Sequence, residues 1–350
     1  MQKLDSHYKF WRYLCYMTLV ATVIFLFNIY GAVADSVSKG SSNTSIAKSN
    51  GMRLSTSSYP DTQLARSHRE RRGRKGNRRR SRSEDTPNET KNSVEPCSAC
   101  ETVDGFVLMS MISDAVRIMV GKSQIVDKSE AVDIQKSRGG IETGLKPDFI
   151  GGADCPEIDS EQWAIDYSYK RPWPAIHKGI DIPQPKSTPI RAVADGTVVG
   201  KFLNTGNRKG IEVVLRHSPQ QTGLSFWTYS QYTHLLAMSP MTIGTSAKMG
   251  QEIGKTSNTG KMGRRIRRDA LHFAIIYSEH PEWSNDGRFV TPKDGYWMDP
   301  NAFYRLTPPY DSKSVKALSE DQKATPVPYV KPDGSFVPQN TKRIWPYPCD

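Results

Sequence analysis

The chain has 350 residues, enough for about two folded units at roughly 150 residues per domain. Hydrophobic residues make up 37% of the chain and charged residues 24%, and this composition excludes a chain that is disordered throughout. The mean hydropathy of −0.58 excludes a protein that crosses the membrane many times. The net charge of +12 arises mainly in one segment, 66–83, so the rest of the chain is nearly balanced in charge.

Residues 1–34 predict an export segment. An apolar run over 13–33 follows three basic residues and ends at the small residues Ala32 and Ala34. We favour a signal peptide cleaved at this small-residue site; the alternative is an uncut membrane anchor, because about 20 apolar residues span a bilayer. In either case we expect an exported protein of the periplasm or cell envelope, and the anchor would hold it in the inner membrane.

Residues 35–96 predict a disordered basic linker, because Ser, Thr, Asn, Arg and Lys predominate and large apolar side chains are scarce. The basic block 66–83 within it has no interleaved aromatic residues. On the outer side of a membrane such a block attracts lipid headgroups or envelope polymers. We therefore expect binding to an anionic envelope surface through 66–83 and expect no specific binding of nucleic acid.

Four cysteines lie beyond the export segment: Cys97, Cys100, Cys155 and Cys349. An even number of cysteines in an oxidising compartment indicates disulfides. Cys97 and Cys100 have the spacing of a redox motif or half a zinc site, but the sequence holds no second such pair. They pair either with each other or with Cys155 and Cys349, and the sequence does not decide between these arrangements.

The regions on either side of the central domain are predicted to be small. Residues 97–169 form an N-terminal region with one amphipathic helix, because apolar side chains between 104 and 121 recur at helical spacing. After 306 the chain is rich in Pro, Lys and Ser. We expect 307–350 to be an irregular C-terminal tail that wraps the preceding domain and is held through Cys349.

Residues 170–306 predict a mainly β fold class, a compact antiparallel β-sheet domain of the barrel or sandwich type. Short β-branched or alternating runs separated by Gly, Pro, Asn and Asp are typical of short antiparallel strands. No long helical period interrupts them. The expected strands are 190–199, 210–217, 225–235 and 271–277, with turn residues at 195–196, 204–210 and 258–263.

Three side chains of this domain predict a zinc site. His177 and Asp181 are four residues apart, so on an extended backbone both point to one side, and Gly179 between them leaves room for an ion. His272 is the best third ligand, because the apolar residues next to it alternate onto the opposite, core-facing side. Zinc accepts His nitrogen and Asp oxygen, and a catalytic site keeps a fourth position open for water.

His234 is expected to act as the general base, on a strand face shared with Ser230 and Tyr232. A single histidine has the simpler interpretation of a hydrogen-bonded or exposed side chain. The prediction of a catalytic site therefore depends on the four residues taken together.

Several short motifs follow one another through the predicted β domain. In chain order they are His177-x-Gly179-x-Asp181, Val193-Ala194-Asp195-Gly196-Thr197-Val198, Ile211 to His217, Tyr229-x-x-Tyr232-x-His234-Leu235, Gly250-Gln251-x-Ile253-Gly254, Ser257-Asn258-Thr259-Gly260 and Leu271-His272-Phe273. This succession resembles the lysostaphin/LytM-type zinc metallopeptidases over about 170–305. The resemblance implies hydrolysis of peptide bonds in bacterial peptidoglycan.

The resemblance also implies roles for single residues. His177, Asp181 and His272 would bind one Zn2+ per domain, and His234 would be catalytic. On this view the substrate groove is lined by Tyr229 and Tyr232, and His217 is structural.

One position departs from the family pattern. The family carries His-x-His where this chain has Ala270-Leu271-His272, and Ala270 neither positions water nor stabilises a charged intermediate. A side chain at 270 would share a strand face with His272 and point into the site. The preceding segment 261–269 is longer and more basic than in the family, and one of its arginines (Arg264, Arg265, Arg267 or Arg268) could supply positive charge to an oxyanion.

Two functions follow from these features. The first is an exported zinc metalloendopeptidase that remodels peptidoglycan locally, with activity reduced by Ala270. The second is a catalytically degenerate domain that binds the cell wall or a partner and regulates or scaffolds an envelope or secretion machine. Retention of all three expected ligands favours the enzyme.

Overall fold

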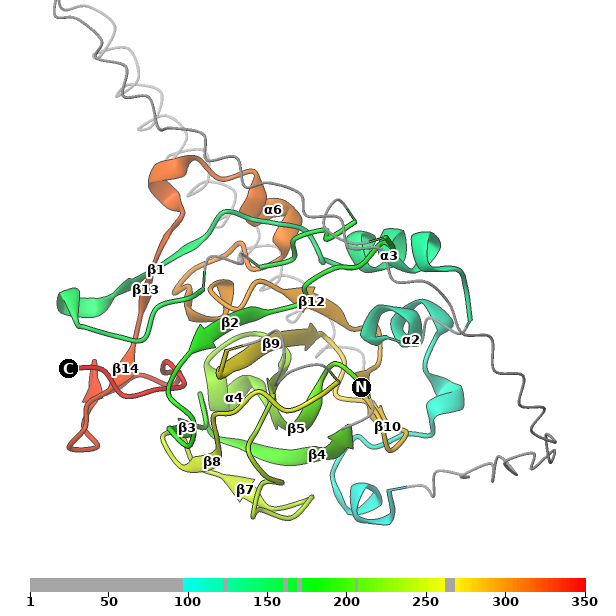
Figure 1. Ribbon diagram of the computed structural model, residues 1–350, viewed down its shortest axis with the longest axis horizontal. Helices are drawn as coiled ribbons and strands as arrows, with labels where there is room; N and C mark the ends of the chain where they lie inside the picture. Colours follow the sequence, from blue (N-terminus) through cyan, green and yellow to red (C-terminus); the bar gives the residue numbers. More distant parts are fainter. Residues whose placement is uncertain (1–96, 122–124, 160–162, 169–171, 205–206, 262–267) are drawn as a thin grey trace, which may run out of the picture. The chain divides into compact units, whose positions relative to one another are not determined.

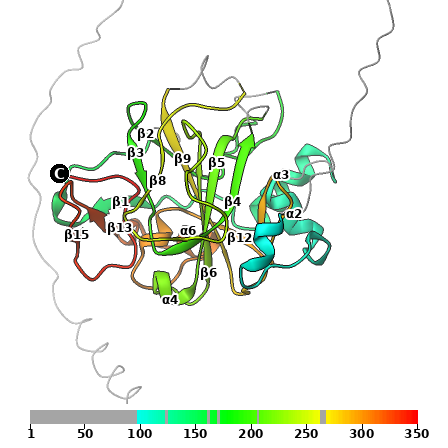
Figure 2. The same cartoon turned by 90° about the horizontal axis from the view of Figure 1, so that it is seen from below.

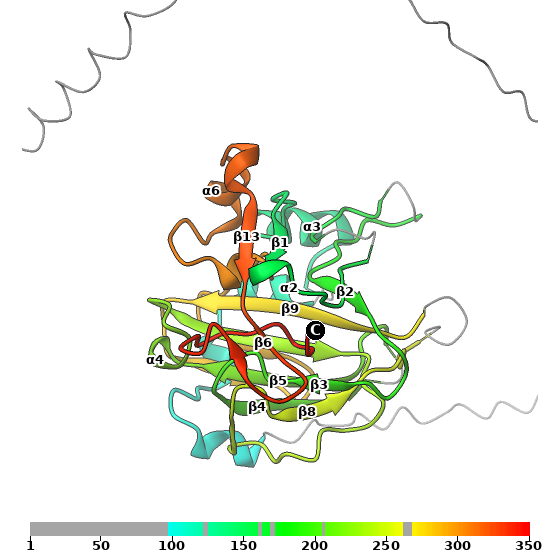
Figure 3. The same ribbon diagram turned by 90° about the vertical axis from the view of Figure 1, so that its left-hand side faces the viewer.

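A seven-stranded antiparallel sheet forms the centre of the computed structural model (Figure 1). The structure describes residues 97–121, 125–159, 163–168, 172–204, 207–261 and 268–350. Six strands follow the order β12-β9-β6-β5-β4-β7, and β2 also pairs with β9. The strands are β2 Ile180–Pro183, β4 Gly196–Asn204, β5 Gly210–His217, β6 Trp227–Thr233, β7 Ser246–Ala247, β9 Ala270–Ser278 and β12 Tyr296–Met298. The mainly β, antiparallel fold class is confirmed, and Figure 3 shows β9, β6, β5 and β4 following one another across the sheet.

Four two-stranded sheets surround the central one. Three are antiparallel: β3 Pro189–Arg191 with β8 Glu252–Lys255, β10 Trp283–Asn285 with β11 Val290–Pro292, and β14 Tyr329–Val330 with β15 Phe336–Val337. The fourth is parallel and joins β1 Lys146–Phe149 to β13 Ala324–Val327, which places the N-terminal region beside the C-terminal tail. One short α-helix lies within the described part of the β domain, α4 Pro219–Thr222, and it connects β5 to β6.

Three of the four expected strands are confirmed, and the fourth is divided into two. The strands β2, β7, β8, β10, β11 and β12 were not predicted. β5 has the predicted bounds, and β6 and β9 differ from the predicted runs by one or two residues at each end. The predicted strand 190–199 is wrong in its middle, because β3 ends at Arg191 and β4 begins at Gly196. Between them the Asp195 carboxylate accepts a hydrogen bond from the Met249 backbone (2.8 Å), which turns the chain away from the extended path.

The N-terminal region has two α-helices among its described residues, where one was expected. They are α2 Asp114–Val120 and α3 Lys128–Ser137, which lie side by side (Figure 2), and the 3-10 turns are η1 Ser98–Thr102, η2 Met109–Met111 and η3 Ile150–Gly152. The predicted helix over 104–121 is too long, because residues 105–107 exchange backbone hydrogen bonds with Trp283 instead. Sequence periodicity missed α3 because it buries only Ala131, Val132 and Gln135.

The C-terminal tail is more regular than predicted. It contains α6 Ser312–Lys316, the 3-10 turn η5 Glu320–Gln322 and the strands β13, β14 and β15. η4 Ala302–Tyr304 precedes it. The side chains of Ile344, Trp345 and Tyr347 are fully buried. These residues belong to the core of the described unit, so the prediction of an irregular segment is wrong.

Two disulfides settle the cysteine pairing that the sequence left open. Cys97 is joined to Cys100, and Cys155 is joined to Cys349 across 194 residues. The second bond holds the C-terminal tail against the N-terminal region. In the described part of the chain, no helix has the length and apolar character needed to cross a membrane; the predicted export segment 1–34 and the basic block 66–83 lie outside that part.

A candidate metal centre in a basic cavity

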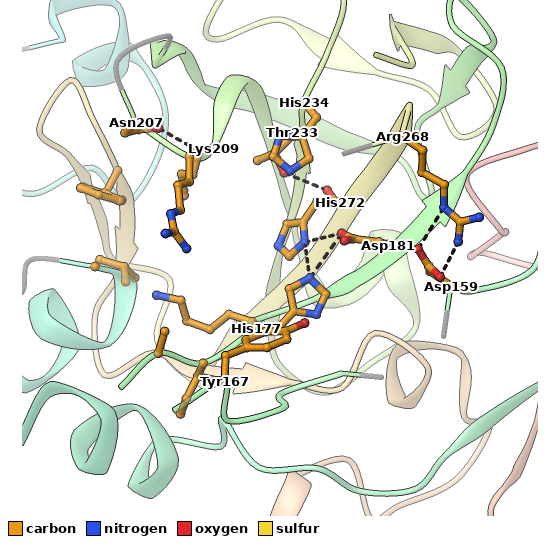
Figure 4. Close-up of a pocket in the computed structure, with 17 residues that line it drawn as sticks. Asp159, Tyr167, His177, Asp181, Asn207, Lys209, Thr233, His234, Arg268 and His272 are labelled. Carbon is orange, nitrogen blue, oxygen red and sulfur yellow. Dashed lines mark hydrogen bonds and ion pairs between the residues drawn. The ribbon is translucent and has the colours of Figure 1, made fainter. Parts of the chain in front are cut away.

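A cavity of about 720 Å³ opens where β2 and β9 meet the loops after β4 and β6 (Figure 4). Its wall contains all four predicted catalytic and metal-binding residues. Those residues are His177, Asp181, His234 and His272. The end of α2 also lines it through Val120 and Gly121, so the N-terminal region contributes to the site.

His177, Asp181 and His272 meet at one point. The Nε2 atom of His177 lies 3.0 Å from Nδ1 of His272 and 3.3 Å from Oδ1 of Asp181. The remaining distance, between Nδ1 of His272 and Oδ1 of Asp181, is 2.9 Å. With zinc bonds of roughly 2.0–2.1 Å and tetrahedral angles, neighbouring ligand atoms are about 3.3 Å apart. The donor set and its spacing therefore fit a zinc ion, with one coordination position left for a fourth ligand.

The backbone brings these ligands together by strand pairing. Asp181 on β2 is the register partner of His272 on β9. His177 lies just before β2, where its backbone N–H donates to the Ile165 carbonyl (3.0 Å) and its ring contacts Tyr167 edge-on. Each candidate ligand is thus positioned by backbone pairing or by contacts within the chain.

Gly179 has a different role from the one predicted. A Cβ atom built on Gly179 would lie 2.5 Å from the Phe273 carbonyl oxygen and 2.8 Å from the His272 ring. The missing side chain therefore makes room for β9 and for the ligand His272, and only indirectly for an ion.

The charge state of Asp181 suits a metal ligand. Burial acts to raise the pKa of Asp181, but hydrogen bonds and charge from His177 and His272 outweigh burial and hold that pKa well below its usual value. The carboxylate is therefore ionised over the whole neutral range and offers an anionic oxygen to a cation.

His234 lies beside the metal ligands, with its ring centroid 6.0 Å from that of His272. Its φ of +66° lies in the left-handed region, which ends β6 and turns the ring out of the strand alternation into the cavity. The Nδ1 atom is 3.0 Å from the Thr259 carbonyl oxygen, which only accepts, so Nδ1 carries the proton and Nε2 carries the lone pair. This tautomer suits a general base.

Tyr229 and Tyr232 do not line the cavity, so the expectation that they form a substrate groove is wrong. Both side chains are 0% exposed and pack in the core. The Tyr232 hydroxyl accepts from the Val193 backbone (3.0 Å), and the Tyr229 hydroxyl accepts from Arg216 Nε (3.3 Å). Alternation along β6 puts Tyr232 on the face opposite Thr233, and the left-handed turn at His234 lets that ring reach the cavity. Tyr229 has the parity of Thr233 but lies further along the strand, where Arg216 covers it.

Ala270 is buried on β9, and it is absent from the described cavity wall. Arg268 does reach the wall, where its guanidinium forms an ion pair with Asp159 (Figure 4). The Asp159 backbone N–H in turn donates to the Asp181 carbonyl (2.8 Å). Arg264, Arg265 and Arg267 lie outside the described residues.

The structure places further side chains in the cavity that sequence reasoning did not select. Lys178, Asn207, Lys209 and Thr233 belong to the wall. Thr233 on β6 is the register partner of His272 on β9, and its hydroxyl donates to the His272 carbonyl (3.1 Å). Lys178 directly follows the candidate ligand His177 in the sequence. This adjacency is the sequence feature from which its place in the cavity wall could have been predicted.

His217, to which no chemistry was assigned, is fully buried away from the cavity. Its Nδ1 donates to the Asp195 carbonyl (2.7 Å) and its Nε2 accepts from Ser230 (2.7 Å). Burial lowers the pKa of His217 to about 4, so the ring is neutral at physiological pH.

Residues 175–284 match the family model described as Peptidase family M23. The match confirms, for this region of the chain, the family resemblance stated from the motifs. No curated protein matches the chain.

Solved structures with a similar fold include the catalytic domain of lysostaphin from Staphylococcus simulans (24% identity, 29% of this chain and 68% of that chain, TM-score 0.24). LytU is 24% identical, over 41% of this chain and 82% of its own, with a TM-score of 0.29. A zinc containing peptidase from Vibrio cholerae is 20% identical, over 43% of this chain and 40% of its own, with a TM-score of 0.28. At these identities and TM-scores the likeness assigns no residue role.

Proposed function

We propose that the protein is an exported zinc metalloendopeptidase that hydrolyses peptide bonds of bacterial peptidoglycan. The observation that carries the proposal is the meeting of His177, Asp181 and His272 at 2.9–3.3 Å from one another, with His234 beside them in one cavity. The match of residues 175–284 to a peptidase family model supports the hydrolysis of a peptide bond.

In the proposed reaction the three metal ligands and His234 have different roles. When bound by His177, Asp181 and His272, zinc would supply a Lewis acid for the scissile carbonyl and for water. Nε2 of His234 takes the proton of the attacking water and returns it to the leaving amine, while the Thr259 carbonyl holds the ring in the required tautomer. Arg268 is engaged by Asp159, so a role for it at an oxyanion would require this ion pair to open.

We place the enzyme in the periplasm or cell envelope, delivered by the export segment 1–34. In the proposal the linker 35–96 gives the catalytic domain its reach, and the basic block 66–83 holds it near anionic envelope surfaces. Peptidoglycan is the substrate, and proteins of an envelope or secretion machine are the proposed partners.

A second candidate function is favoured by one observation. Position 270 holds a buried alanine where the lysostaphin/LytM-type pattern has a histidine. A domain that keeps its ligands but lacks this side chain could bind the cell wall or a partner and regulate an envelope machine without hydrolysis.

The test measures zinc content and the release of soluble muropeptides from purified sacculi by the full-length protein. His177→Ala removes a ligand, Ala270→His restores the family residue, and His280→Ala is the matched control, because His280 is exposed and absent from the cavity wall. The enzyme proposal expects stoichiometric zinc and muropeptide release in the wild type and in His280→Ala, with both lost in His177→Ala.

The two candidates differ in one outcome. Zinc without release in the wild type, with release gained in Ala270→His, would identify the binding domain. Absence of zinc from all four proteins would overturn the metal centre itself.

A further inference from the structure

The wall of the cavity is rich in positive charge. Among the lining residues that the structure describes, four side chains are cationic, namely Lys178, Arg208, Lys209 and Arg268. Two are carboxylates, namely Asp159 and Asp181. One of these, Asp181, belongs to the proposed metal centre, so the rest of the cavity carries an excess of cations.

Three of the cations are already engaged. Lys209 Nζ lies 2.9 Å from both carboxylate oxygens of Glu212, whose side chain is 0% exposed. Arg268 is held by Asp159 at the opposite side of the metal ligands (Figure 4). Arg208 stacks its guanidinium over the ring of Trp173, 5.3 Å from the ring centroid.

Lys178 is different. Within the part of the chain that the structure describes, its ammonium group makes no hydrogen bond and no ion pair, and its contact is with the ring of Trp297, 5.6 Å from the centroid. The side chain is partly buried, and it lies near enough to Lys209 and Glu212 for both charges to act on it. Glu212 neutralises Lys209 but makes no ion pair with Lys178, so the charge of Lys178 is left for a ligand.

We propose that Lys178 binds a free carboxylate of the peptide substrate and thereby selects peptides that carry a negative charge next to the scissile bond. The residue follows the ligand His177 directly, so a peptide lying across the metal centre passes it. A partly buried ammonium group without an anionic partner has given up hydration, and a carboxylate restores the lost interaction with a charge-assisted hydrogen bond. This subsite rests on the proposed peptidase function and adds its substrate class.

The experiment compares three peptides with the zinc-loaded full-length protein. All three peptides contain the cleaved bond. The first carries a side-chain carboxylate and a C-terminal carboxylate. In the second peptide the side-chain carboxylate is replaced by a carboxamide, and in the third the C-terminal carboxylate is replaced by a carboxamide. The variants are Lys178→Met, which keeps length without charge, and Lys178→Arg, which keeps charge. Lys186→Met is the matched control, since Lys186 is exposed and outside the cavity wall.

We expect amidation of one of the two carboxylates to lower kcat/KM of the wild type by about 10- to 100-fold. Lys178→Met should lower kcat/KM for the fully charged peptide by a similar factor and leave kcat/KM for the poorly cleaved amide unchanged. Lys178→Arg should retain most of the preference for the charged peptide over that amide. Lys186→Met should behave as wild type. Which amide is the poor substrate tells whether the anion is a side chain or a C-terminus.

Binding of the same peptides is measured by calorimetry, so that the subsite is tested apart from catalysis. If the wild type cleaves none of the peptides but binds the charged one at least tenfold more tightly, and Lys178→Met abolishes that difference, the subsite stands and the peptidase proposal fails. Equal kcat/KM and equal Kd for charged and amidated peptides in the wild type, or an equal loss on every peptide in Lys178→Met, overturns the subsite.

Discussion

Asp181 on β2 and His272 on β9 are register partners, and their side chains meet 2.9 Å apart. Two strands of the central sheet thus place two ligands of the proposed metal centre, and the backbone pairing fixes them before any ion arrives. Metal binding therefore does not carry the entropic cost of ordering these two side chains.

Asp181→Asn should remove metal binding without unfolding the protein, because the amide keeps the shape but not the negative charge of the ligand. In protein stripped of metal and then given excess zinc, the wild type gains about 3 kcal/mol of stability at a free zinc concentration of 100 times the Kd, and the variant gains almost none at that concentration. Thermal unfolding with and without zinc measures the gain. Asp148→Asn, at an exposed position on β1, should match the wild type, and an equal zinc response in Asp181→Asn would contradict the ligand assignment.

His234→Asn tests the general base. Asparagine tolerates the left-handed φ of +66° found here, so the substitution changes the chemistry more than the backbone. We expect kcat/KM on a peptide substrate to fall by about 100-fold or more, with zinc content unchanged. Steady-state kinetics and metal analysis on one preparation provide both numbers; activity within a few-fold of wild type would exclude His234 as the base.

The two disulfides should differ in their effect on stability. The loop closed by Cys155 and Cys349 spans 194 residues and that closed by Cys97 and Cys100 spans 3. Chain entropy gives about 5 kcal/mol for the long loop and about 2 kcal/mol for the short one. Replacing both cysteines of a pair by serine and measuring denaturant unfolding should therefore lower stability more for Cys155 and Cys349, and the opposite order would show that chain entropy is not the main contribution.

His217 should make the protein sensitive to mild acid. Its pKa falls from 6.5 to about 4 on folding, so between these pH values the unfolded chain takes up a proton that the folded chain does not. The free energy of unfolding therefore decreases as the pH falls from 6.5 to 4, by up to about 3 kcal/mol from this group. His217→Asn can keep the hydrogen bond to Asp195 and lacks this titration, so its unfolding free energy should fall less steeply over the same range; equal slopes would contradict the assignment.

The site was predictable where the information is local. His177, Gly179 and Asp181 lie within five residues, and the apolar neighbours of His272 alternate regularly on one strand. Period-two reasoning therefore placed the three candidate ligands on one side. The same reasoning failed for Tyr232, because His234 leaves the alternation through its positive φ. It failed for Tyr229 because this side chain is buried against Arg216. A change of backbone region at one residue is not visible in hydrophobic periodicity.

The remaining differences come from contacts between distant residues. Pairing of 105–107 with Trp283 shortens the predicted helix, and β1 pairs with β13 although more than 170 residues separate them. Short strands of this kind carry too few residues for a sequence pattern. Lys178 is likewise informative only once the structure shows that Lys209 already has Glu212 as its partner.

Burial of Trp345 and Tyr347, pairing of β13 with β1 and the bond between Cys155 and Cys349 make residues 324–349 part of the same core as the N-terminal region. A chain that stops before residue 324 already contains the four residues of the candidate site but lacks the segment that completes this core. Residues 324–349 contribute no side chain to the described cavity wall, yet the domain that carries the candidate site cannot close its core without them.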